Sequence, residues 1–227
     1  MSVLNFLTKK VDVSNRKSDK NEESLIYEND EANSISKKTL EELAIKGDTY
    51  WKFSQSVRGR SVENHFIDYI EGTIITAEDC SKYLSFVPQS HIALCSMYGD
   101  TLTKFSFDLN DPLFDKIKDE QYTFYNSVLM EYDAKRLVVE KNYSLSDIET
   151  IGMVIEMSSC WDQITNFIYG LPNYIDCLHK RLESYGYTES AAFVEYLEKN
   201  YNFYSFEDTE NVRKNIHRII ENYNNDI

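Results

Sequence analysis

The sequence predicts an α+β fold that is predominantly helical and is organised around one central apolar helix at 146–169. Two further observations favour this class. An antiparallel β-hairpin, or a small sheet, is expected at 91–109. The 227 residues also include only seven glycines and three prolines, so few residues interrupt the helical segments. We expect a flexible acidic and polar arm at 1–36, followed by a single helix-rich α+β domain at 37–227.

The arm is expected to be flexible because its polar part, 12–36, contains only one apolar island, at 25–27. Such a segment buries too little apolar surface to offset the entropy lost on ordering. Helix-start signals after the arm predict three short helices, beginning at Thr39, Ser61 and Thr76. The third is expected to run through Leu84 and to end at Pro88.

The hairpin prediction depends on Gly99 and Asp100, a residue pair typical of two-residue β-turns. Pairing across this turn would place apolar residues opposite one another on one face of the hairpin. Register and hydrophobic pattern therefore agree. The residues expected on that common face are Ile92, Leu94, Phe105 and Phe107.

The central helix is predicted from apolar residues at helical spacing between Ile148 and Ile168, with Trp161 expected to be buried. Ser146 and Glu149 match a capping box, which would start the helix. Gly170 and Pro172 would end it. Acidic residues interrupt the apolar run, which makes a membrane span a poor interpretation.

The remaining elements are expected to be mostly helical. Asp111, followed by proline, is a helix start, whereas 122–132 fits either a helix or a strand. A short buried strand is expected at 137–139. Three helices should follow at 174–185, at 189–200 and from Asp208 or Thr209 onward.

Three polar residues suggest catalysis. Asp111, Asp133 and Lys135 are similar in pattern to PD-(D/E)xK nucleases, in which carboxylates hold a metal and a lysine polarises water. A polar turn between two elements explains the same residues equally well. An enzyme that acts on nucleotides or nucleic acid through the 111–135 region is therefore the alternative function.

Histidine and cysteine occur close together twice, as His91 with Cys95 and as Cys177 with His179. Zinc sites usually need four ligands at recognisable spacing, and no such framework is evident. We therefore expect no metal and no cofactor, while a Cys–His nucleophile pair stays open because its partners can be distant in sequence. The unpaired spacing of the four cysteines suggests reduced thiols and a cytoplasmic location.

The charge balance points to a protein partner. Asp and Glu number 38 against 24 Lys and Arg, which gives a formal net charge of -14. Such a surface disfavours phosphate backbones and anionic membranes, so we expect neither nucleic acid nor membrane binding. The leading prediction is an acidic, non-catalytic interaction module that binds a basic protein, as an immunity protein, an antitoxin or an accessory subunit does.

Two binding regions are candidates. Tyrosine is favoured at interface hot spots, and the carboxy-terminal candidates are Tyr201, Tyr204, Glu207, Asp208 and Glu210. These tyrosines could instead only seal the end of the last helix pair. In the second region, Arg58 and Arg60 precede a predicted helix start and could hold an anion, or could belong to an ordinary surface loop.

Overall fold

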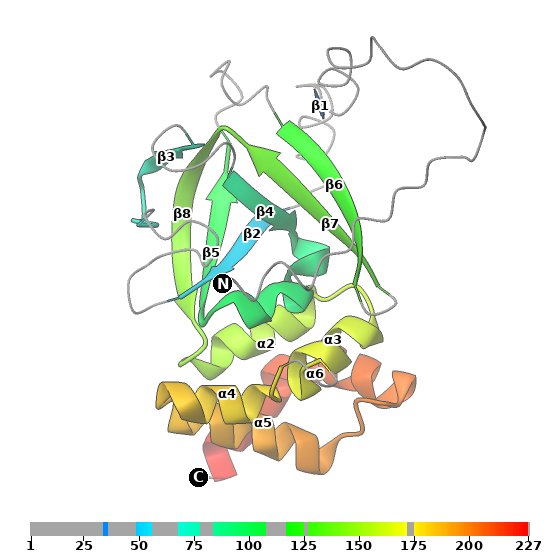
Figure 1. Cartoon of the computed structure of the whole chain (residues 1–227). Helices are drawn as coiled ribbons and strands as arrows, with labels where there is room; N and C mark the ends of the chain where they lie inside the picture. Colours follow the sequence, from blue (N-terminus) through cyan, green and yellow to red (C-terminus); the bar gives the residue numbers. More distant parts are fainter. Residues whose placement is uncertain are drawn as a thin grey trace, which may run out of the picture.

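The protein combines an antiparallel β-sheet with a layer of helices, so the expected α+β class is confirmed (Figure 1). The computed structural model describes residues 34–35, 49–55, 68–77, 84–107, 117–124, 127–171 and 175–226. The helices lie together on one side of the sheet. None of the described helices combines the length and the apolarity that crossing a bilayer requires.

The described sheet is larger than expected, with eight strands in the order β1-β6-β7-β4-β2-β5-β8-β3. All neighbouring strands pair antiparallel. The strands are β1 (Ser34–Ile35), β2 (Tyr50–Ser54), β3 (Ile74–Thr76), β4 (Leu84–Pro88), β5 (Thr101–Ser106), β6 (Ile117–Phe124), β7 (Ser127–Ala134) and β8 (Arg136–Ser144).

Strands β7 and β8 are one continuous run with a single bend at Lys135. Before the bend the run pairs with β4 and β6, and after it the run pairs with β3 and β5. A bent strand of this kind lets one segment serve two parts of a sheet. The segment 122–132 therefore falls mostly into strands β6 and β7, where its backbone groups form a sheet ladder, and the expected strand at 137–139 is confirmed within β8.

The predicted hairpin at 91–109 is wrong in its first half. Residues Gln89–Tyr98 form a 3₁₀ helix, η4, and only Thr101–Ser106 form a strand. Gly99 has extended backbone and lies so close to the carbonyl of Ser54 in β2 that a Cβ there would overlap it. The glycine thus serves a close backbone approach and not a turn. Asp100 is buried and accepts a hydrogen bond of 2.6 Å from the hydroxyl of Tyr187.

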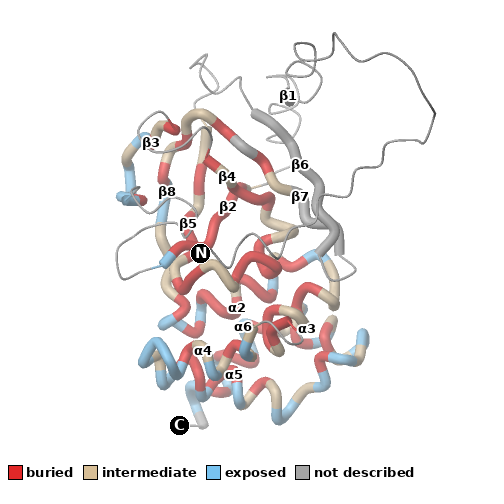
Figure 2. The backbone as a smooth tube through the Cα atoms, in the orientation of Figure 1, coloured by how far each residue is buried: buried red, intermediate tan, exposed pale blue. Residues whose placement is uncertain are grey.

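The four apolar residues expected on one hairpin face in fact lie on two sides of the sheet. Ile92 and Leu94 belong to the core between the sheet and the helices. Phe105 is part of a second core on the opposite face of the sheet, and Phe107 packs against it. Strand β2 faces both, because Trp51 contributes to the first core and Tyr50 to the second. Figure 2 shows the resulting buried central strands.

The central helix is divided into α2 (Ile148–Met157) and α3 (Trp161–Tyr169), so a single helix over 146–169 is wrong. Between them, the hydroxyl of Ser158 donates to the carbonyl of Val154 over 2.8 Å, and Gln163 accepts from the amide of Ser159. Serine side chains that bond the backbone compete with helix continuation. Trp161 begins α3 and is only half-buried, contrary to expectation.

The helix starts also differ in detail. Asp147, and not Ser146, caps α2, with its carboxylate accepting from the amide of Glu149 over 3.0 Å. The three carboxy-terminal helices are present as α4 (Leu178–Tyr185), α5 (Thr188–Asn200) and α6 (Phe206–Asp226). Helix α6 begins before the expected Asp208, because Ser205 accepts a hydrogen bond from the Asp208 amide.

The structure also tests the expected helix through Leu84 and part of the expected amino-terminal arm. Residues Leu84–Pro88 form strand β4, so a helix through Leu84 is wrong. Ser34 and Ile35, inside the expected 1–36 arm, pair with β6. The helix expected to begin at Thr39 and the rest of the arm lie outside the described residues. The helix expected from Ser61 to Glu71 lies mostly outside them, and its last residues, 68–71, are described and are not helical. The division into an arm and one domain stays a prediction.

Candidate functional site

The loop at 201–205, between α5 and α6, positions the aromatic residues predicted to bind a partner. Phe203 anchors this loop, because its side chain is fully buried in the core. Its carbonyl accepts hydrogen bonds from two threonine hydroxyls, over 2.5 Å from Thr165 in α3 and over 3.2 Å from Thr209 in α6. The loop is therefore tied to α3 and to α6.

Hydrogen bonds within the loop add to this anchoring. The side-chain oxygen of Asn202 accepts from the amide of Tyr204 over 3.1 Å, which is an Asx-turn. The carboxylate of Asp208 accepts from the amide of Asn202 over 3.3 Å. These bonds fix the backbone on both sides of Phe203, so the position of Tyr204 is determined by the loop.

Three aromatic side chains, Tyr169, Tyr204 and Phe206, form what we call the aromatic patch. The ring of Tyr204 stacks on that of Tyr169, with centroids 4.7 Å apart and planes only 5° from parallel. Tyr204 and Phe206 are nevertheless 68% and 63% exposed. Burial, followed by the charges of Tyr204 and Glu198, raises the pKa of Tyr169, so the Tyr169 phenol stays neutral at physiological pH.

The five predicted binding residues separate into different roles. Tyr204 and Glu207 are exposed, whereas Tyr201 is half-buried and packs against the core, as the sealing alternative predicts. Glu210 is held by Arg213 over 2.8 Å and by Lys214 over 3.7 Å. The hydrogen bond from Arg213 is the main reason that the pKa of Glu210 is lowered. Glu207 is therefore the acidic side chain of this set most available to a partner.

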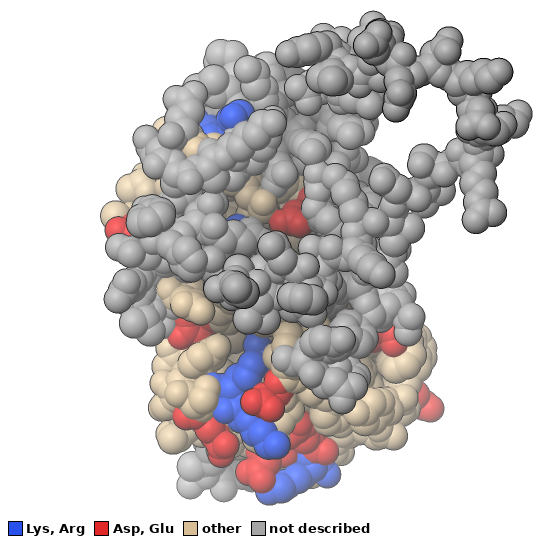
Figure 3. Space-filling view, in the orientation of Figure 1, with Lys and Arg blue, Asp and Glu red and all other residues tan. Residues whose placement is uncertain are grey.

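Basic and acidic side chains are mixed on the helical layer. On the face shown in Figure 3, Lys and Arg side chains lie among Asp and Glu side chains over the helices. The net charge of -14 is thus not displayed there as one continuous acidic surface. It acts as an overall field to which local acids such as Glu207 add.

A small pocket lies beside α4, lined by residues that include Asn166, Leu171 and Ile175. Arg181 also lines the pocket and donates to the carbonyl and the hydroxyl of Ser96, over 2.9 and 3.3 Å. The Nε of Arg181 is buried without a hydrogen-bond partner among the described residues. Desolvation by burial lowers the pKa of this guanidinium, although it stays charged.

The structure does not bring the predicted nuclease residues into a described site. Asp133 lies in β7 opposite Ser85 and Lys118 of the neighbouring strands. Lys135 occupies the bend between β7 and β8, where its carbonyl accepts from the amide of Ala77. Asp111, Arg58 and Arg60 lie outside the described residues. The nuclease-like alternative stays an untested prediction.

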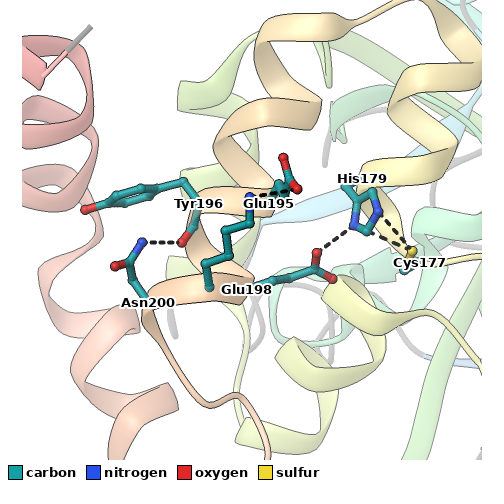
Figure 4. A network of polar contacts seen from close by, with 7 residues as sticks. Cys177, His179, Glu195, Tyr196, Glu198 and Asn200 are labelled. Atoms are coloured by element: carbon teal, nitrogen blue, oxygen red, sulfur yellow. Dashed lines mark hydrogen bonds and ion pairs between the residues drawn. The ribbon is translucent and has the colours of Figure 1, made fainter.

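The second His/Cys pair gains a third member in the folded chain (Figure 4). His179 Nδ1 lies 2.6 Å from the Glu198 carboxylate and 3.6 Å from the Cys177 sulfur. All three residues are half-buried. In the first pair, by contrast, His91 Nδ1 lies 2.9 Å from the Ser90 hydroxyl and Cys95 is buried. Sequence spacing could not reveal Glu198, because it lies on the next helix.

The chain was compared with protein-family models, with curated proteins and with solved structures, and none of the three comparisons gave a match.

Proposed function

We propose that the protein is a cytoplasmic, non-catalytic interaction module that binds a basic protein partner through the aromatic patch and Glu207. An immunity protein, an antitoxin or an accessory subunit has this role. The observation that carries the proposal is the stacked and exposed Tyr204, held by an anchored loop.

The aromatic patch has the physical properties of an interface anchor. Large aromatic residues carry much of the energy at protein interfaces. Tyr204 is already fixed against Tyr169 and by the Asx-turn, so binding would cost little additional side-chain entropy. Phe206, two residues further along the chain, is also exposed and adds apolar area that a partner would remove from water.

Charge defines the kind of partner. A net charge of -14 attracts a basic protein over a distance of about 8 Å at physiological ionic strength. Such steering acts mainly on the association rate, whereas buried aromatic contacts act on dissociation. The proposal therefore assigns separate kinetic roles to Glu207 and Tyr204.

The test begins with capture of the partner from the native host, followed by association and dissociation rates across a salt series. Tyr204→Ala should accelerate dissociation about tenfold or more. The matched control is Tyr185→Ala, which removes a tyrosine on α4 that is 43% exposed and lies outside the patch. Glu207→Gln should slow association, and the slowing should become smaller as the salt concentration rises.

Three outcomes would contradict the proposal. Tyr204→Ala could release the partner no faster than Tyr185→Ala, or capture could be independent of salt. The purified protein could also turn over a nucleotide without any partner, which would support the enzymatic alternative. Glu207 is preferred to Asp208 for the charge test because Asp208 also holds the Asn202 amide, so its replacement would disturb the loop.

A further inference from the structure

We propose that Cys177, His179 and Glu198 bind one zinc ion, with a fourth position open to water or to an external ligand. These residues provide a thiolate, an imidazole and a carboxylate, all of which are zinc ligands. The three donor atoms lie within 4.8 Å of one another. The inference is independent of the proposed partner binding.

The distances can be compared with those of a tetrahedral zinc site. Zinc bonds of about 2.3 Å to sulfur and about 2.05 Å to nitrogen place those two ligand atoms about 3.5 Å apart. The Cys177 sulfur lies 3.6 Å from His179 Nδ1, which agrees with this separation. The sulfur also lies 3.8 Å from Nε2, so the imidazole would have to turn until its Nδ1 points at an ion shared with Cys177.

The contact between His179 and Glu198 would have to lengthen. Nitrogen and oxygen ligands of one tetrahedral zinc ion lie about 3.3 Å apart, whereas these atoms are 2.6 Å apart as a hydrogen bond. The two atoms would have to move apart by about 0.7 Å to make room for the ion. Zinc would displace the proton of this bond and that of the thiol, so binding should release protons.

The backbone holds the three ligands on adjoining elements. Cys177 lies at the N-cap of α4 and His179 lies in its first turn. Glu198 lies near the end of α5, which packs directly against α4. Helices that are packed together position ligands more accurately than loops do.

The surroundings of the cluster leave the ligands available. No Lys or Arg of the described chain forms an ion pair with Glu198, because the neighbouring Lys199 is paired with Glu195 over 2.9 Å. The side chains of His179 and Glu198 are 25% and 15% exposed. Partial exposure leaves solvent access for a fourth ligand, as in open zinc sites.

The test uses the full-length protein after treatment with a chelator and measures zinc affinity by competition with a coloured chelator. Wild type should bind one zinc per chain. Cys177→Ser and His179→Gln should each weaken binding by about tenfold or more, and Glu198→Gln by about tenfold. Matched controls are Cys160→Ser and His217→Gln, which change the same residue types outside the cluster and should leave the affinity unchanged.

Two further measurements do not depend on variants that could fold poorly. Cobalt(II) should produce the thiolate charge-transfer absorption that indicates cysteine ligation, and zinc should protect Cys177 from alkylation. Absence of one-to-one binding, absence of the cobalt–thiolate absorption, or binding that survives Cys177→Ser, would overturn the site. Rapid alkylation of Cys177 that zinc does not slow would also overturn it, and would instead indicate a Cys–His nucleophile pair.

Discussion

The buried carbonyl of Phe203 allows a quantitative test of how the 201–205 loop is held. The Thr165 hydroxyl lies 2.5 Å from this carbonyl and 3.0 Å from that of Trp161, so its single proton favours Phe203. The Thr209 hydroxyl lies 2.9 Å from the Ser205 carbonyl and 3.2 Å from that of Phe203. Thr165 is thus the main donor to the Phe203 carbonyl, and Thr209 can donate to it when Thr165 does not.

Each hydroxyl alone should contribute modestly. Thr165→Val should reduce the free energy of unfolding by about 0.5–1.5 kcal/mol, because Thr209 can turn its proton to Phe203. Thr209→Val should cost a similar amount, since Thr165 still satisfies the carbonyl. The double variant leaves neither donor, and a buried acceptor without a partner costs about 1–3 kcal/mol. We therefore expect a loss about 1 kcal/mol greater than the sum of the single losses.

The assay is urea unfolding of the four proteins of this cycle, with unfolding slopes compared to exclude a change in the unfolded state. Thr188→Val is the control, because Thr188 is exposed at the start of α5 and its loss should change stability little. Additive losses would refute the shared-acceptor interpretation. They would indicate that water or another group reaches the Phe203 carbonyl.

Two other predictions follow from the backbone and from charge. Gly170→Ala should lower the melting temperature more than Gly186→Ala, since both glycines have positive φ but only at Gly170 would a Cβ overlap the Ile175 carbonyl; equal losses would contradict this. The Lys104 hydrogen bond, at 2.7 Å, lowers the pKa of Glu140 in the folded state. Wild type should therefore exceed Glu140→Gln in stability above about pH 4.3, and lose this advantage as the pH falls through the lower folded pKa. A stability difference that does not shrink as the pH is lowered below about 4.3 would oppose it.

The sequence predicted helices and helix ends more reliably than it predicted the pairing of strands. Helices α4, α5 and α6 follow from apolar spacing, because each helix makes its hydrogen bonds within its own segment. Gly170 and Gly186 mark helix ends for the same local reason. The split between α2 and α3 also had a local signal, the adjacent Ser158 and Ser159, which apolar periodicity concealed.

Strand pairing required the tertiary structure. The segment Tyr50–Ser54 is buried throughout, so it lacks the alternation that identifies a half-buried strand. Its strand character depends on β4 and β5, whose residues lie far away in the sequence. Gly99 and Asp100 likewise have the composition of a hairpin turn, and only the proximity of Ser54 shows their actual use.

The sequence by itself determined the mixed class, the carboxy-terminal helices, the acidic balance and a set of five carboxy-terminal binding candidates, from which exposure in the structure selects Tyr204 and Glu207. Only the tertiary structure stacked Tyr204 on Tyr169, paired Glu210 with Arg213 and placed Glu198 beside His179. The physical reason is the distance along the chain over which each feature is determined. Composition and helical periodicity act within a few residues, whereas a stacked ring, an exposed fraction or a set of three ligands depends on which helices pack together.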